Sequence, residues 1–146
     1  NMAIIQSIKI KAYFVQSDEM EKLINNNSRA MLNFGHTFGH ALEAMNRYSQ
    51  NLTHGEAISI GMSFATKISY KLNYISEKNY MDFIDHLKKV KLPYSDARIG
   101  KNEIYNLMLL DKKNTDNKIN LILLKSIGKA FFYRGLEKRS IKKLLL

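Results

Sequence analysis

Apolar residues recur at intervals of three and four along most of this chain, the spacing that gathers them on one face of an α-helix. Helices are predicted over residues 2–17, from a cap at Ser28 on towards Met45, from Thr53 to about residue 72, from Ser76 to Pro93, over 101–111 and over 136–146. Thr53 and Glu56 have the spacing of a capping box, and Pro93 is the single proline. A mainly α fold is therefore expected.

A small β-hairpin is the one interruption of this pattern that the sequence predicts. Residues 119–124 form a short apolar run typical of a strand, and residues 130–133 are expected to pair with it across a turn at Gly128. With 146 residues and 45% hydrophobic content, the chain suits one domain, residues 1–146, around one core. No Gly-x-Gly-x-x-Gly pattern follows a strand, so no residue of this chain is assigned to a dinucleotide cofactor.

The net charge of +10 is large for a chain of this length, and it admits three interpretations. The preferred one is a solvated lysine-rich surface, the second is an anionic small-molecule substrate, and the third is nucleic acid. The lysines are spread along the whole chain, which disfavours nucleic acid. The chain has no cysteine, no apolar run of membrane-spanning length and no signal peptide, so we expect a cytoplasmic protein without membrane contact.

Three of the four histidines fall within nineteen residues. His36 and His40 are four apart, which places both imidazoles on one face of a helix, and His54 opens the next helix. Imidazole suits zinc and other borderline divalent ions, so all three are candidate ligands. Histidines that merely lie in the core or on the surface remain the alternative. His86 lies on a charged helix and is expected to be solvated.

The segment from Arg29 to Glu43, followed by His54-Gly55-Glu56-Ala57, resembles the signature of the 3-dehydroquinate synthases. That family carries Arg-x-x-Leu-Asn-x-Gly-His-Thr-x-Gly-His-Ala-x-Glu and then His-Gly-Glu-Ala, and every fixed position is matched. The resemblance extends to Lys11-Ala12, to Asp18-Glu19 with Glu21, and to Asp111-Lys112-Lys113. It implies the C-terminal domain of the architecture shared by dehydroquinate synthases and iron-type alcohol dehydrogenases. The N-terminal NAD-binding domain of that architecture has no counterpart in this chain.

The resemblance also implies an activity and a metal site. It indicates a carbon–oxygen lyase of the shikimate pathway, which converts 3-deoxy-arabino-heptulosonate 7-phosphate to 3-dehydroquinate and phosphate during aromatic amino acid biosynthesis. His36 and His54 are then expected to bind zinc, or another divalent metal such as cobalt. The third protein ligand is expected to be a glutamate of the missing domain. Within this family, His40 faces the substrate rather than the metal.

The residues implied to grip the substrate are Lys11, Arg29, Asn33, His40 and Lys113, with Lys112 as the alternative to Lys113. The expected partners are the anionic sugar phosphate, the NAD-binding domain and a second copy in a homodimer. Without that domain, the chain is expected to be inactive.

Three rival functions stay open. A related sugar-phosphate cyclase would keep the same residues. A metal-dependent alcohol or glycerol dehydrogenase needs no grip on phosphate and carboxylate, so Lys11, Arg29 and Asn33 argue against it. A basic helical nucleic-acid-binding module would leave the histidines unexplained.

Overall fold

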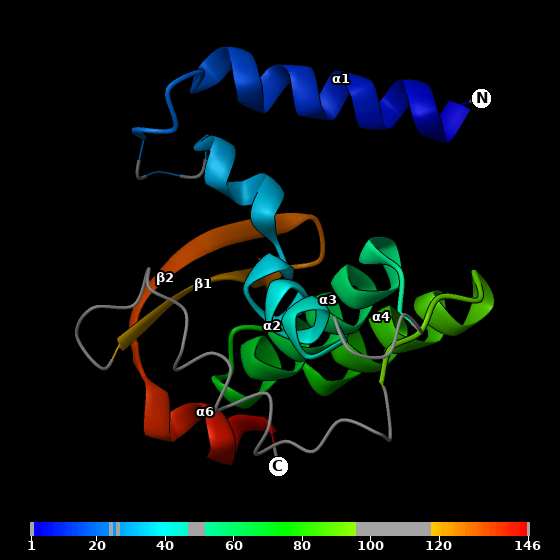
Figure 1. Ribbon diagram of the computed structural model, residues 1–146, viewed down its shortest axis with the longest axis vertical. Helices are drawn as coiled ribbons and strands as arrows, with labels where there is room; N and C mark the ends of the chain where they lie inside the picture. Colours follow the sequence, from blue (N-terminus) through cyan, green and yellow to red (C-terminus); the bar gives the residue numbers. More distant parts are fainter. Residues whose placement is uncertain (1, 24, 26, 47–51, 96–117, 146) are drawn as a thin grey trace.

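The computed structural model describes residues 2–23, 25, 27–46, 52–95 and 118–145. These residues form α1 (Met2–Ser17), the 3-10 helix η1 (Arg29–Asn33), α2 (His36–Asn46), α3 (His54–Lys71), α4 (Glu77–Lys89), β1 (Lys118–Ser126), β2 (Lys129–Glu137) and α6 (Lys138–Leu145), shown in Figure 1. The mainly α fold with one small hairpin is confirmed. The helix predicted over 101–111 lies outside the described residues.

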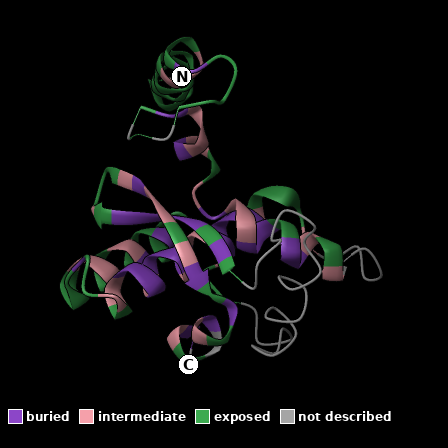
Figure 2. Ribbon diagram, turned by 90° about the vertical axis from the view of Figure 1, so that its left-hand side faces the viewer, coloured by how far each residue is buried: buried purple, intermediate pink, exposed green. Residues whose placement is uncertain are grey.

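Helix α3 is the centre of the core, because it packs against α2, α4, β1 and α6. The capping box predicted at its start is present: the Thr53 hydroxyl accepts from the Glu56 N–H, and the Glu56 carboxylate accepts from the Thr53 N–H. The innermost side chains come from α3 and from α2, β1 and α6, which pack on it, and they include Phe38, Leu42, Ile60, Ile68, Ile119, Leu123, Ile141 and Leu145. Figure 2 shows these inner faces as buried. Removal of this apolar surface from water is the main stabilising contribution.

The hairpin is longer than the sequence predicts. β1 and β2 pair antiparallel from Lys118 opposite Glu137 to Ser126 opposite Lys129. Gly128 closes the turn at a φ of 81°, a left-handed conformation that glycine adopts without steric cost. Leu136 pairs with Ile119 in this sheet, so the last helix begins at Lys138 rather than at residue 136.

The helix predicted from Ser28 towards Met45 is interrupted, which corrects the expectation of one continuous helix. Ser28 does act as a cap, since its hydroxyl accepts a 3.1 Å hydrogen bond from the Ala30 N–H, but the element it starts is only η1. Gly35 then takes a φ of 81° and turns the chain before α2 begins at His36. Residues 29–40 therefore do not form a single helical stripe.

The fourth predicted helix also ends early. α4 stops at Lys89 rather than at Pro93, because Lys91 adopts a φ of 59° that no helix continues through. Val90, which directly follows α4, is 48% exposed. His86 is exposed, as predicted.

Helix α1 lies apart from the helical body and contacts chiefly η1 (Figure 1). The sequence predicts its extent correctly. Its apolar side chains are not buried, however, and Ile8 is 62% exposed. Figure 2 shows the helix along its axis, exposed on nearly every side. Among the described residues, no helix combines the length and apolar content needed to cross a membrane.

Candidate active site

Three glycines bring α2 into direct contact with α3. A Cβ atom added at Gly35 would lie 2.6 Å from the Met62 backbone nitrogen. One added at Gly61 would lie 2.8 Å from the Gly39 nitrogen. Only hydrogen fits in these places, so the two backbones approach more closely than ordinary helices do. The contact sets α2, with its histidines, against the first turn of α3.

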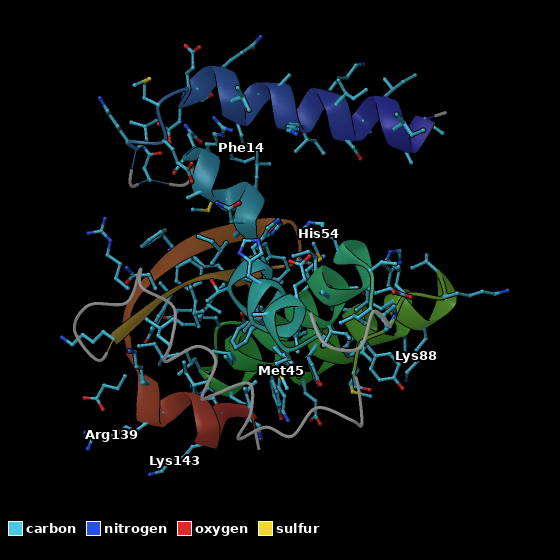
Figure 3. The ribbon with its side chains drawn as sticks, in the orientation of Figure 1. Phe14, Met45, His54, Lys88, Arg139 and Lys143 are labelled. Carbon is cyan, nitrogen blue, oxygen red and sulfur yellow. The ribbon has the colours of Figure 1, made fainter. Side chains whose placement is uncertain are left out.

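The three imidazoles lie close together at this junction. The ring centroids of His36 and His40 are 5.5 Å apart, those of His36 and His54 are 6.0 Å apart, and those of His40 and His54 are 6.4 Å apart. Figure 3 shows His54 on the side of the helical body that faces α1. The first residue of α3 and the first two turns of α2 therefore form one imidazole cluster.

Hydrogen bonds engage one nitrogen on two of these rings. His54 Nδ1 lies 2.8 Å from Glu43 Oε1, and His36 Nδ1 lies 3.4 Å from the Phe34 carbonyl oxygen. Among the residues that the structure describes, neither ring has a hydrogen bond at Nε2. Glu43 belongs to the matched signature, but no role was predicted for it. The signal that could have revealed one is spacing, because Glu43 follows His36 by seven residues and His40 by three on the same face of α2.

The imidazoles fit part of a divalent metal site. Burial lowers the pKa of His36, and the neighbouring His40 and His54 lower it further, while the Phe34 carbonyl and Glu43 act in the opposite direction. A neutral imidazole is the form that binds a metal. Among the described residues, however, no three His, Asp or Glu side chains are placed to hold an ion by themselves. The described residues therefore offer imidazole donors without a complete ligand set.

A pocket of about 490 Å³ lies beside His36, between α1 and η1. Its walls bring together four of the predicted site residues, Lys11, Arg29, Asn33 and His36, with Glu21, Ser7, Ile10 and Leu32 completing the lining. His40 and His54 do not line it. Lys112 and Lys113 lie outside the described residues. Two cationic side chains face one carboxylate in this pocket, which favours an anionic ligand.

Asp18 holds the loop that joins the two walls. Its carboxylate accepts hydrogen bonds from the backbone N–H groups of Lys22 at 2.7 Å, Leu23 at 3.1 Å and Arg29 at 3.1 Å, and from the Ser28 hydroxyl at 3.2 Å. Burial alone would raise the pKa of Asp18, but these donors outweigh it and lower the pKa. The Asp18 carboxylate thereby fixes the loop end that carries Arg29 to the C-terminal end of α1, the helix that carries Lys11.

Polar contacts also position two side chains in the pocket wall. The Asn33 amide donates to Glu21 Oε1 at 3.3 Å, and Arg29 Nη1 donates to the Glu19 carbonyl at 3.3 Å. In the structure Asp18 holds the Arg29 backbone, while Glu21 engages Asn33.

Comparison with known proteins shows which sequences and structures the chain is similar to. The sequence model of the family described as 3-dehydroquinate synthase C-terminal matches residues 1–114. The chain is 39% identical over 139 residues to the 3-dehydroquinate synthase of Thermoanaerobacter pseudethanolicus, covering 95% of this chain and 38% of that protein. It is 41% identical over 148 residues to that of Pelagibacter ubique, covering 98% of this chain and 39% of that protein. The chain thus spans about two fifths of the length of these relatives.

Solved structures share the fold. A 2-deoxy-scyllo-inosose synthase complexed with carbaglucose-6-phosphate, NAD⁺ and Co²⁺ superposes with a TM-score of 0.67 at 26% identity, over 80% of this chain and 33% of that one. A 2-epi-5-epi-valiolone synthase from Streptomyces hygroscopicus, with NAD⁺ and Zn²⁺ bound, has a TM-score of 0.66 at 23% identity, over 78% and 31%. The family match across residues 1–114 identifies the chain as a member of the 3-dehydroquinate synthase C-terminal family.

Proposed function

We propose that this chain is the metal- and substrate-binding part of a 3-dehydroquinate synthase, which converts 3-deoxy-arabino-heptulosonate 7-phosphate to 3-dehydroquinate and phosphate. One observation carries the proposal: Lys11, Arg29 and Asn33 line the same pocket as His36, which belongs to the imidazole cluster. The identity of 39% and 41% to curated synthases supports this substrate over others.

The pocket residues suit a substrate that carries both a carboxylate and a phosphate. The Arg29 guanidinium can donate two parallel hydrogen bonds to one oxyanion. Lys11 offers a point charge from the opposite wall, and the Asn33 amide offers a neutral donor and acceptor. His40 is exposed beside His36, and its ring nitrogens can form hydrogen bonds with a substrate that extends beyond the pocket lining.

The proposed cofactors are a divalent metal and NAD. Zinc or cobalt, held in part by His36 and His54, would supply Lewis-acid polarisation of a substrate oxygen. NAD, which would accept and return a hydride, is expected to bind mainly to a second domain. The proposal therefore includes that NAD-binding domain as a partner, a homodimer of the complete enzyme, and a cytoplasmic location suited to the shikimate pathway.

A related sugar-phosphate cyclase is the second candidate, because a 2-deoxy-scyllo-inosose synthase shares the fold at 26% identity. It would use the same metal and the same cationic pocket. An alcohol or glycerol dehydrogenase has no need of Lys11 and Arg29 in one pocket. A nucleic-acid-binding module has no need of the imidazole cluster.

The decisive experiment joins the chain to the N-terminal part of the Thermoanaerobacter relative and measures phosphate release with NAD and Zn²⁺. Release from 3-deoxy-arabino-heptulosonate 7-phosphate, and none from glucose 6-phosphate, would support the synthase. The reverse preference would support the cyclase. The chain by itself should release no phosphate, since it holds neither a dinucleotide motif nor a complete set of metal ligands among its described residues. A folded fusion that binds NAD and zinc yet releases phosphate from neither substrate would refute both functions.

A further inference from the structure

Among the described residues, the imidazole of His54 has one hydrogen-bonding partner. His54 is the first residue of α3, and its ring is 61% exposed, so little packing restrains it. The capping box at Thr53 and Glu56 fixes the backbone at this point but does not touch the ring. What the ring does contact is the Glu43 carboxylate, 2.8 Å from Nδ1.

Glu43 has no competing use among the residues that the structure describes. Its carboxylate is 34% exposed, and within that part of the chain its one ion-pair or hydrogen-bond partner is His54. The residue lies on the face of α2 that carries His36 and His40. The same helix face thus supplies two imidazoles of the cluster and the carboxylate that reaches the third. The close contact between Gly39 and Ile58, where an added Cβ would lie 3.2 Å from the Ile58 Cα, holds the two helices in this register.

The chemistry of the contact decides which ring nitrogen carries hydrogen. An ionised carboxylate only accepts hydrogen bonds, so His54 must present Nδ1–H to Glu43. The lone pair of the neutral ring is then on Nε2. Free histidine prefers the opposite tautomer, with hydrogen on Nε2 and no lone pair there. A carboxylate that holds Nδ1–H is also the usual partner of metal-binding imidazoles, because it fixes the ring and makes its other nitrogen more basic.

We infer that Glu43 is a positioning residue that selects the Nδ1–H tautomer and the ring orientation of His54, leaving Nε2 ready to bind a divalent cation. The tautomer selection stands on the hydrogen bond between the two side chains. Its consequence for metal binding rests on the proposed function. Glu43 acts through His54 and is not itself a ligand of the ion.

The first test reads the tautomer directly, in the metal-free chain. Long-range ¹H–¹⁵N correlation spectra of the ¹⁵N-labelled chain, recorded at mildly alkaline pH, distinguish Nδ1–H from Nε2–H rings. The wild-type His54 should be mainly Nδ1–H, and Glu43→Ala should shift it to mainly Nε2–H at an unchanged melting temperature. Glu77→Gln is the matched control, because Glu77 is an exposed glutamate in the first turn of α4. An Nε2–H ring in the wild type, or an unchanged ring in Glu43→Ala, would overturn the inference.

The second test titrates the same proteins with Zn²⁺ alone. Glu43→Ala should bind zinc about tenfold to a hundredfold more weakly than the wild type, while Glu77→Gln should match the wild type. Unchanged zinc affinity in Glu43→Ala would refute the link between the tautomer and the metal. If the tautomer responds to Glu43→Ala but the wild type binds no zinc in the chain or in the two-domain fusion, the positioning of His54 stands and the proposed function fails.

Discussion

The Asp18 carboxylate accepts a 3.1 Å hydrogen bond from the backbone N–H of Arg29, eleven positions further along the chain. The other carboxylate oxygen accepts from Lys22 and Leu23, at the start of the same loop. One side chain that is 6% exposed therefore closes both ends of the loop. Because the ends are fixed, extra residues within the loop need not move the pocket wall, and long surface loops cost little in stability.

The lowered pKa of Asp18 predicts how this clamp responds to acid. The folded protein binds the proton of Asp18 more weakly than the unfolded chain, whose aspartates have the ordinary value of 3.8. The stabilisation is therefore complete above that pH and is lost as the pH falls through the lower folded pKa. Asp18→Asn should unfold at a lower temperature than the wild type at pH 7, and the difference should shrink towards pH 3. Thermal melts across this range give the measurement, and a difference that is constant with pH would contradict the assignment.

Arg29 and Asn33 are predicted to serve the substrate rather than the fold. In the active two-domain enzyme, Arg29→Ala and Asn33→Ala should each lower kcat/KM by on the order of tenfold to a thousandfold, or ~1–4 kcal/mol of transition-state stabilisation. Arg29→Lys keeps the charge but loses the planar fork, so it should also reduce turnover.

The matched control for this prediction is Arg139→Ala. Arg139 pairs with Glu137 at 2.6 Å and lies on α6, at the opposite end of the molecule from α1 (Figure 3). Its loss should leave kcat/KM unchanged. Zinc content and melting temperature are measured on the same preparations. If activity falls only in step with metal loss or unfolding, Arg29 and Asn33 are structural residues.

His36 and His54 are predicted to be the metal ligands of the cluster. The chain alone should bind Zn²⁺ weakly, because two imidazoles leave the coordination shell incomplete. His36→Ala and His54→Ala should each weaken zinc binding by more than the roughly 10–100-fold that loss of an orienting partner causes. His86→Ala should have no effect, because His86 is an exposed residue of α4. An effect of His40→Ala as large as that of the other two would instead favour three imidazole ligands.

Short sequence patterns correctly predict those structural features that depend only on neighbouring residues. The capping box at Thr53 marks the start of α3, and the glycine at 128 marks the turn of the hairpin, because each acts on its own neighbours. The approach of His36 and His40 follows from helical spacing. For His54, the sequence predicts only that it opens the next helix. Its placement beside His36 and His40 depends on how α2 packs against α3, which local spacing does not show.

Other features have no local cause. Gly35 interrupts the predicted helix at a φ of 81°, at a point where its backbone lies close to Met62. The role of Asp18 was not predictable in detail, since three of its four partners are backbone N–H groups that carry no sequence signal. Periodicity correctly gave α1 an apolar face, but it cannot show whether anything covers that face, and Ile8 is exposed.

The glycine contact between α2 and α3 can be tested with two glycines of α3, Gly61 in the contact and Gly55 outside it. A methyl group at Gly61 would lie 2.8 Å from the backbone nitrogen of Gly39 and would also press on the Gly35 backbone, neither of which can rotate away. Gly61→Ala should therefore push the helices apart and destabilise the fold by about 1–3 kcal/mol. Gly55→Ala adds the same methyl group in the first turn of α3 with nothing within 4 Å, and it should be neutral or stabilise by up to about 1 kcal/mol.

Urea unfolding of both variants measures this difference, and zinc titration shows its consequence for the site. Because the same contact sets α2 against the first turn of α3, Gly61→Ala should also displace His36 and His40 from His54 and weaken zinc binding in the fraction that stays folded. Gly55→Ala should bind zinc as the wild type does, although Gly55 is the direct neighbour of His54 in the chain. Equal stability and equal zinc affinity in the two variants would mean that the helices can separate without cost, and that the glycines do not set the position of the imidazole cluster.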